Sequence, residues 1–213
     1  MITIEGIESV ALSSIWMLNP SLPELLLELG KRGYAVARVR PRSLGGYDVI
    51  FIEPNVVAFR KSTFILYDPN RRMITIEGSD ANDVFDVFND VEKVLKNVGS
   101  NPDRGVLFYE LLSKAKAVGN KWILNKPIKV DDLLGLDLLA MPMSFVSAKG
   151  DPNSKQWFQL DIRPIWTSWS DEKVRYEVIL ICRDSKERLV DILKNINNVL
   201  KNILERISNI LIK

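Results

Sequence analysis

The sequence Trp-Met-Leu-Asn at residues 16–19 returns as Trp-Ile-Leu-Asn at residues 122–125. Further along, Val-Leu-Lys-Asn-Val at residues 94–98 returns as Val-Leu-Lys-Asn-Ile at residues 199–203, and the two offsets differ by one residue. Two matches in nearly one register indicate an internal duplication. Because repeated units bury their apolar surface against one another, we expect one pseudo-symmetric body whose joint surface carries the binding site.

The boundary between the copies is expected at Asn101-Pro102-Asp103, where turn-forming residues interrupt the periodic pattern. This places a first repeat at residues 1–100 and a second at residues 101–213, the latter with an extended C-terminal helix. The linker is short, so the halves are expected to pack closely. Trp16 and Trp122 occupy equivalent places, and we expect each to anchor the core of its own copy.

In the first copy, Ser21 and Glu24 form a capping-box pattern that predicts a short helix to about Gly30. A second helix is expected to open at Ser79 or Asp80 and to end at Gly99, since its apolar residues repeat at intervals of three and four. Between the two helices, period-two alternation and turn residues predict strands at 34–42, 47–52, 56–67 and 73–77.

In the second copy, the pattern predicts helices at 104–118 and 130–139, followed by strands at 140–147, 157–165 and 174–182. A terminal helix follows a capping signal at residues 184–187, and it runs about ten residues past its counterpart. At 1.5 Å per residue it is roughly 40 Å long. We therefore expect part of its apolar face to contact the other half or a second chain.

The order of elements predicts an α+β fold. Two such units would share one antiparallel sheet, with the long helices packed on one face and the other face left free. That free face is the expected working surface.

Residues 62–78, Ser-Thr-Phe-Ile-Leu-Tyr-Asp-Pro-Asn-Arg-Arg-Met-Ile-Thr-Ile-Glu-Gly, precede an acid-capped helix that ends at Gly99. This segment resembles the last hairpin and long helix of one repeat of the TATA-box-binding protein family. The resemblance implies a similar fold, in which two repeats form a saddle with helices on its convex side. DNA binding is not carried over, because Cys182 stands where the counterpart of Gly78 is expected and the terminal helix is longer.

Composition restricts the chemistry. The 213 residues are 46% apolar and 26% charged, with a net charge of +2, no histidine and one cysteine. Without histidine, the Ser-His-Asp triad and His-ligated metal sites are excluded, and we expect a non-catalytic protein without cofactor or metal. We also expect a soluble protein of the reducing cytoplasm, without a membrane span. Few Cys, no His and plentiful Lys, Glu and Ile are typical of thermophile proteins.

Three classes of function remain open. The first is protein association, including self-association, through the overlong terminal helix; its residues are Leu200, Leu204, Ile207 and Leu211. The second is nucleic-acid binding on the free sheet face by basic and aromatic side chains; these are Arg38, Arg40, Arg60, Trp157 and Arg163. The alternative for these arginines is a solvated face that pairs with neighbouring carboxylates. The third class is a small-molecule pocket or a carboxylate-based enzyme.

Overall fold

The computed structural model describes residues 2–43, 45–120, 128–133, 136–140, 143–147, 154–165 and 173–211. For residues 120, 128–133, 136–140, 210 and 211 the description covers the backbone alone. The predicted core role of Trp122 therefore falls outside the described residues.

The first half of the chain contains, in order, β1 (Thr3–Trp16), α1 (Leu22–Lys31), β2 (Ala35–Val36), β3 (Arg38–Pro41), β4 (Tyr47–Ile50), β5 (Val56–Arg60), β6 (Thr63–Asp68), β7 (Met73–Gly78) and α2 (Ala81–Asn97). The second half contains α3 (Pro102–Gly105), β8 (Val106–Asn120), β9 (Ile128–Leu133), β10 (Leu136–Ala140), β11 (Met143–Val146), β12 (Trp157–Pro164), β13 (Lys173–Asp184), α4 (Lys186–Lys194) and α5 (Ile196–Leu211).

The predicted α+β class is confirmed, and its main component is a large antiparallel sheet. Within the described residues nine strands form this sheet, in the order β11-β12-β13-β8-β1-β7-β6-β5-β2. Two further pairs, β3-β4 and β9-β10, make separate two-stranded sheets. The predicted strand at 34–42 is therefore divided, since β2 pairs with β5 whereas β3 pairs with β4.

The chain forms two compact units. One, called here the hairpin unit, contains Ser9–Leu111 and Arg183–Lys194, and the other, the terminal unit, contains Met1–Glu8, Leu112–Cys182 and Asn195–Lys213. Each unit takes residues from both sides of the linker at 101–103.

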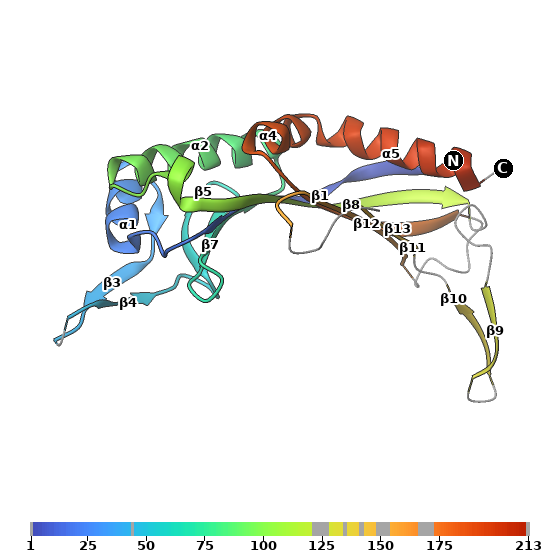
Figure 1. Cartoon of the computed structure of the whole chain (residues 1–213), viewed down its shortest axis with the longest axis horizontal. Helices are drawn as coiled ribbons and strands as arrows, with labels where there is room; N and C mark the ends of the chain where they lie inside the picture. Colours follow the sequence, from blue (N-terminus) through green and yellow to red (C-terminus); the bar gives the residue numbers. More distant parts are fainter. Residues whose placement is uncertain are drawn as a thin grey trace. The chain divides into compact units, whose positions relative to one another are not determined.

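In the hairpin unit, α2 packs against β6 and β7 (Figure 1). Along β6, Ile65 and Tyr67 are buried, and they alternate with the more exposed Phe64 and Leu66. The helix begins where its pattern predicts, because the Asp80 carboxylate accepts hydrogen bonds from the backbone N–H groups of residues 82 and 83. It ends before Gly99, whose φ of 85° is the left-handed conformation that favours glycine. Local signals and burial therefore agree in this part of the fold.

Trp16 lies in the core of the hairpin unit, with 3% of its surface exposed, as its pattern predicts. Its indole N–H donates to the Ser14 hydroxyl at 3.0 Å, and its backbone N–H donates to the carbonyl of Arg72 at 2.9 Å. A Cβ atom added to Gly105 would lie 2.9 Å from the indole ring. Gly105 is therefore required for the close approach of α3 to this ring.

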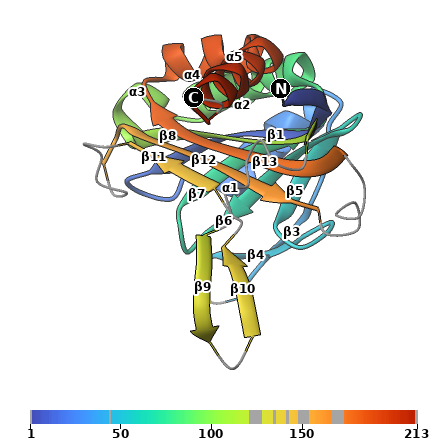
Figure 2. The same cartoon turned by 90° about the vertical axis from the view of Figure 1, so that its right-hand side faces the viewer.

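In the terminal unit, α5 lies over the strands β12 and β13 (Figure 2). Leu200 and Leu204 of α5 and Leu160 and Ile162 of β12 are buried. On β13, Val174, Tyr176 and Val178 are buried, whereas the residues between them are more exposed. The predicted strands of this region are confirmed within a few residues at each end.

Three predicted helical segments differ from the structure. Residues 104–118 form the short helix α3 and then β8, in which Leu111, Ser113, Ala115 and Ala117 are buried at every second position. This period-two burial is that of a strand, and it outweighs the helical spacing in the sequence. Residues 130–139 lie in the pair β9-β10, and the terminal helix is interrupted at Asn195 between α4 and α5.

Candidate docking surface

The pair β3-β4 extends from the edge of the main sheet (Figure 1). Both ends of this hairpin are tied to the region of β5, since Ala37 N–H donates to Val57 at 2.7 Å and Ile52 N–H donates to Val56 at 3.0 Å. Its turn contains Gly45 and Gly46 with φ values of 90° and 81°, which glycine adopts without steric cost. Local turn chemistry thus sets the hairpin, and its base fixes where it leaves the sheet.

Cross-strand pairing divides the side chains of the hairpin into two faces. Val39 lies opposite Val49, and Pro41 lies opposite Tyr47, so one face is apolar. Arg38 lies opposite Ile50 and Arg40 lies opposite Asp48, so the other face is mixed.

The hairpin and the residues that follow it expose an unusual amount of apolar surface. Ten large apolar side chains of the described residues are exposed, and half of them lie between residues 39 and 52. These five, which we call the hairpin surface, are Val39 (36% exposed), Tyr47 (41%), Ile50 (46%), Phe51 (37%) and Ile52 (40%). Val39 and Tyr47 lie on the apolar face and Ile50 on the mixed face, so both faces of the hairpin expose apolar side chains. Single exposed apolar residues are common in soluble proteins, whereas five within one short segment make a candidate interaction surface.

The charge of the hairpin is positive. Arg42 donates through Nε to Asp48 at 2.8 Å, and this hydrogen bond, with the nearby positive charge of Arg40, lowers the pKa of the Asp48 carboxyl. Among the described residues neither Arg38 nor Arg40 has an ion-pair partner, and both are exposed. The apolar cluster is therefore bordered by two cations that remain available to a ligand.

Arg60, the third arginine of the predicted nucleic-acid set in this unit, is engaged elsewhere. Its guanidinium donates to Asp90 at 3.1 Å and lies 4.5 Å from the centre of the Tyr34 ring. Arg32 and the Tyr34 hydroxyl donate to the same carboxylate, each at 3.1 Å. Burial, and then the charge of Asp90, raises the pKa of Tyr34. This cluster joins α1, β5 and α2, which is a structural role.

Trp157 and Arg163 lie on β12 in the other unit, so they are described separately from the hairpin arginines. Arg163 donates to Asp161 at 3.0 Å, and Asp161 also accepts from Ser144 at 2.6 Å and from Gln159 at 3.2 Å. Although its burial alone would raise the pKa of Asp161, these hydrogen bonds hold that pKa below its usual value. For Arg60 and Arg163 the structure therefore matches the alternative of pairing with neighbouring carboxylates.

The residues of the terminal helix that sequence reasoning assigned to protein association are inside the molecule. Leu200 and Leu204 are fully buried, and Ile207 is 8% exposed. The side chain of Leu211 lies outside the described part of the chain. Leu200, Leu204 and Ile207 are therefore buried within the described chain and present little or no surface to a partner.

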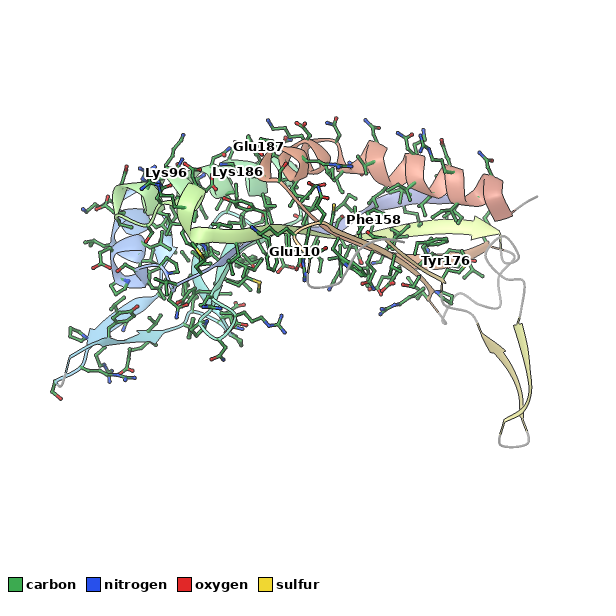
Figure 3. All side chains as sticks on the ribbon, in the orientation of Figure 1. Lys96, Glu110, Phe158, Tyr176, Lys186 and Glu187 are labelled. Atoms are coloured by element: carbon green, nitrogen blue, oxygen red, sulfur yellow. The ribbon has the colours of Figure 1, made fainter. Side chains whose placement is uncertain are left out.

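The most buried ionic group of the hairpin unit is Glu92 on α2, which is 8% exposed. Its carboxylate accepts from the Tyr109 hydroxyl at 3.0 Å and from Lys186 Nζ at 2.8 Å. Figure 3 shows Lys186 at the start of α4. Each of its two oxygens accepts one hydrogen bond, and the bond from Lys186 joins α4 to α2.

No group of three His, Cys, Asp or Glu side chains converges on a metal-sized site within the described residues. Likewise, none of the helices in the ranges given above is long and apolar enough to cross a membrane. The lone cysteine, Cys182, is buried at the end of β13.

Sequence reasoning did not single out the hairpin surface, although one signal was present. Val49-Ile50-Phe51-Ile52 is a run of four apolar residues just after a glycine turn. A strand with one solvated face would alternate polar and apolar residues, so an unbroken run indicates that both faces meet protein. In the described structure of one chain, Ile50, Phe51 and Ile52 of this run are instead exposed.

Comparison with known proteins adds no relative. The chain matches no family model, and neither a curated protein nor a solved structure is significantly similar to it.

Proposed function

We propose that this chain is a non-catalytic binding module that docks a protein partner through the hairpin surface. The observation that carries the proposal is the group of five apolar side chains, each more than a third exposed, on the β3-β4 hairpin and the two residues that follow it. Covering them would remove apolar area from water at about 25 cal/mol per Å². The aromatic members, Tyr47 and Phe51, are residue types that dominate the energetics of protein interfaces.

Nucleic-acid binding is the second candidate, and the two unpaired arginines of β3 favour it. Two observations weigh against it. Three of the five side chains of the hairpin surface, Val39, Ile50 and Ile52, are aliphatic, which leaves Tyr47 and Phe51 alone to stack on bases. Arg60 and Arg163 already pair with carboxylates, so phosphates would have to displace Asp90 and Asp161.

Protein association, which the sequence predicted for the C-terminal helix, is therefore proposed for the hairpin surface instead. With Leu200, Leu204 and Ile207 in the core, the overlong helix supplies stability to its own unit, and the hairpin surface is the part that exceeds what its unit needs.

For the fold as a whole, we propose an internal duplication with the helices on one side of the sheet, similar in fold to the TATA-box-binding protein family. The strand order supports the duplication, since β7-β6-β5 follows β1 in one direction and β13-β12-β11 follows β8 in the other. An experimental structure tests it, because the segment β1 to α2 should superpose on the segment β8 to α5. Unlike topologies in the two halves would refute the duplication.

The docking proposal is tested by photo-crosslinking in the cells that make the protein. A photoreactive phenylalanine analogue is placed at Ile50 and, as the matched control, at Leu27, which is 63% exposed on α1. We expect a discrete crosslinked protein from position 50, none from position 27, and loss of the product when Ile52→Asp is added to the position-50 protein. Absence of the product at position 50, or an equal yield at position 27, refutes the proposal.

A further inference from the structure

Within the described part of the chain, the outer edge of β4 carries backbone groups with which no strand pairs. The N–H of Arg42 donates to the carbonyl of Gly46 at 3.1 Å, so these two residues form a hydrogen-bonded pair at the end of the ladder. In an antiparallel ladder, hydrogen-bonded and non-hydrogen-bonded pairs alternate. Pro41 and Tyr47, and likewise Val39 and Val49, are therefore non-hydrogen-bonded pairs. The N–H and C=O groups of Tyr47 and Val49 point away from β3.

The two edges of the hairpin are not equivalent. On β3 the outward positions are Val39 and Pro41, and proline has no N–H to donate. On β4 the outward positions are Tyr47 and Val49, and each has both a donor and an acceptor. Within the described residues this sheet contains β3 and β4 alone, so β4 is the edge at which a third strand fits.

The charge of the hairpin indicates the chemistry of the third strand that fits at β4. Residues 38–50 contain Arg38, Arg40 and Arg42 against one acidic residue, Asp48, which gives a net charge of +2. A second copy of the hairpin would bring +2 against +2, whereas an acidic strand would complement it. Arg38 and Arg40 share the mixed face of the hairpin, and Tyr47 shares the apolar face with Val49.

Deepening the docking function proposed above, on which this inference rests, we propose that β4 accepts an extended, acidic and aliphatic segment of the partner protein as a third strand. Backbone hydrogen bonds to Tyr47 and Val49 would supply affinity, and alternating side chains would supply specificity. Aliphatic side chains of the segment lie against Tyr47 and Val49. Its carboxylates lie on the face of Arg38 and Arg40, about 10 Å from β3 at two strand spacings, which an arginine and a glutamate side chain span together. Asp48 of β4 shares this face, and its charge is offset by its pair with Arg42.

The test uses the full chain and a labelled synthetic peptide of alternating Glu and Val residues. Two matched peptides separate the contributions. In one, alternate backbone nitrogens are methylated, which removes hydrogen bonds and keeps the side chains, and in the other Lys replaces Glu. We expect the parent peptide to bind and each matched peptide to bind at least about tenfold more weakly. At saturation, hydrogen exchange of the Tyr47 and Val49 amides should slow by about tenfold or more.

A protein variant provides the second arm. Val49→Pro removes an outward donor and leaves the β3-β4 ladder intact, so we expect the same loss of peptide binding, with the Asp48 to Arg42 pair still present. Should this variant not fold, the methylated peptide gives the same information with the unaltered protein.

The outcomes distinguish this inference from the docking function. If the methylated peptide binds as well as its parent, or the Tyr47 and Val49 amides stay unprotected, strand addition is refuted while crosslinking from position 50 still supports docking. If no peptide binds although position 50 crosslinks, the acidic strand is refuted and the docking surface stands. Stronger binding of the Lys peptide refutes the acidic character of the partner, and loss of crosslinking refutes the docking function itself.

Discussion

The hairpins β6-β7 and β3-β4 share a topology and differ in their surroundings. Both are antiparallel pairs of strands joined by turn-forming residues. In β6-β7, Ile65 and Ile76 are completely buried beneath α2, whereas in β3-β4 Ile50 is 46% exposed. An apolar residue in a strand is thus part of a core only where a second layer covers it. The uncovered hairpin is where a further layer, supplied by another molecule, is expected.

The first prediction concerns the free energy of unfolding, on which we expect the largest difference between the two hairpins. We expect Ile65→Ala on β6 to lower the free energy of unfolding by about 2–5 kcal/mol, because it removes buried methyl groups and leaves a cavity. The matched change Ile50→Ala on β4 should alter it by less than about 0.5 kcal/mol. Denaturant unfolding of both variants measures this. Equal losses would show that the β3-β4 hairpin is covered in solution.

A second prediction concerns the packing behind the covered hairpin. Because a Cβ at residue 105 would lie 2.9 Å from the Trp16 ring, Gly105→Ala should cost about 1–3 kcal/mol of overpacking energy. Gly6→Ala is the control, since nothing lies within 4 Å of its added Cβ. Thermal unfolding followed by tryptophan fluorescence measures both. A Gly105→Ala protein as stable as the control would mean that Trp16 can move away.

The ion pairs of the covered and uncovered regions provide a third prediction. Lys186→Met leaves the Glu92 carboxylate buried with the Tyr109 hydroxyl as its one remaining donor, and should cost about 1–2 kcal/mol, since Lys186 is 27% exposed. Arg42→Met removes an exposed pair with Asp48, and the midpoint of unfolding should not change measurably. Urea titrations of the two variants decide between these outcomes. A larger loss for Arg42→Met than for Lys186→Met would reverse the assignment of buried and exposed pairs.

The smallest effect is confined to alkaline pH. Burial, with smaller contributions from Tyr47 and Asp68, raises the pKa of Tyr67 on β6 to about 12, against about 10 in the unfolded chain. The unfolded chain therefore releases its proton first, so this contribution to stability is complete below pH 10 and is lost between about pH 10 and 12. Tyr67→Phe should make the decline in stability over this range less steep. An unchanged slope in unfolding titrations would contradict the raised pKa.

The sequence predicted elements well where one local pattern dominates. The period of α2, its capping residue Asp80 and the glycine that ends it all indicate the same helix, and the structure contains it. Trp16 was likewise placed in the core. The sequence-based prediction was wrong at residues 104–118. There, Leu111, Lys114 and Ala115 fit the spacing of a helix as well as that of a strand, and pairing within the sheet selects the strand.

The candidate site was harder to predict than the fold. Arg38 and Arg40 were named for their shared strand face, and they do share it, on a separate hairpin. The exposure of Ile50 was not foreseen, because an apolar residue in a strand is buried in most proteins. The terminal helix shows the reverse case, since the length of its apolar face indicated a partner, whereas Leu200, Leu204 and Ile207 are buried within the described chain.

The amino-acid sequence alone determined the α+β class, the Asp80 cap and the Gly99 end of α2, and the absence of imidazole chemistry, because these depend on composition and on neighbours a few residues apart. It did not reveal the turn that divides the predicted strand at 56–67 into β5 and β6. The tertiary structure alone decided which apolar faces are covered: that of α5 is buried within the described chain, whereas the side chains of the hairpin surface are not. Burial depends on contacts between residues far apart in sequence, which a local pattern does not encode.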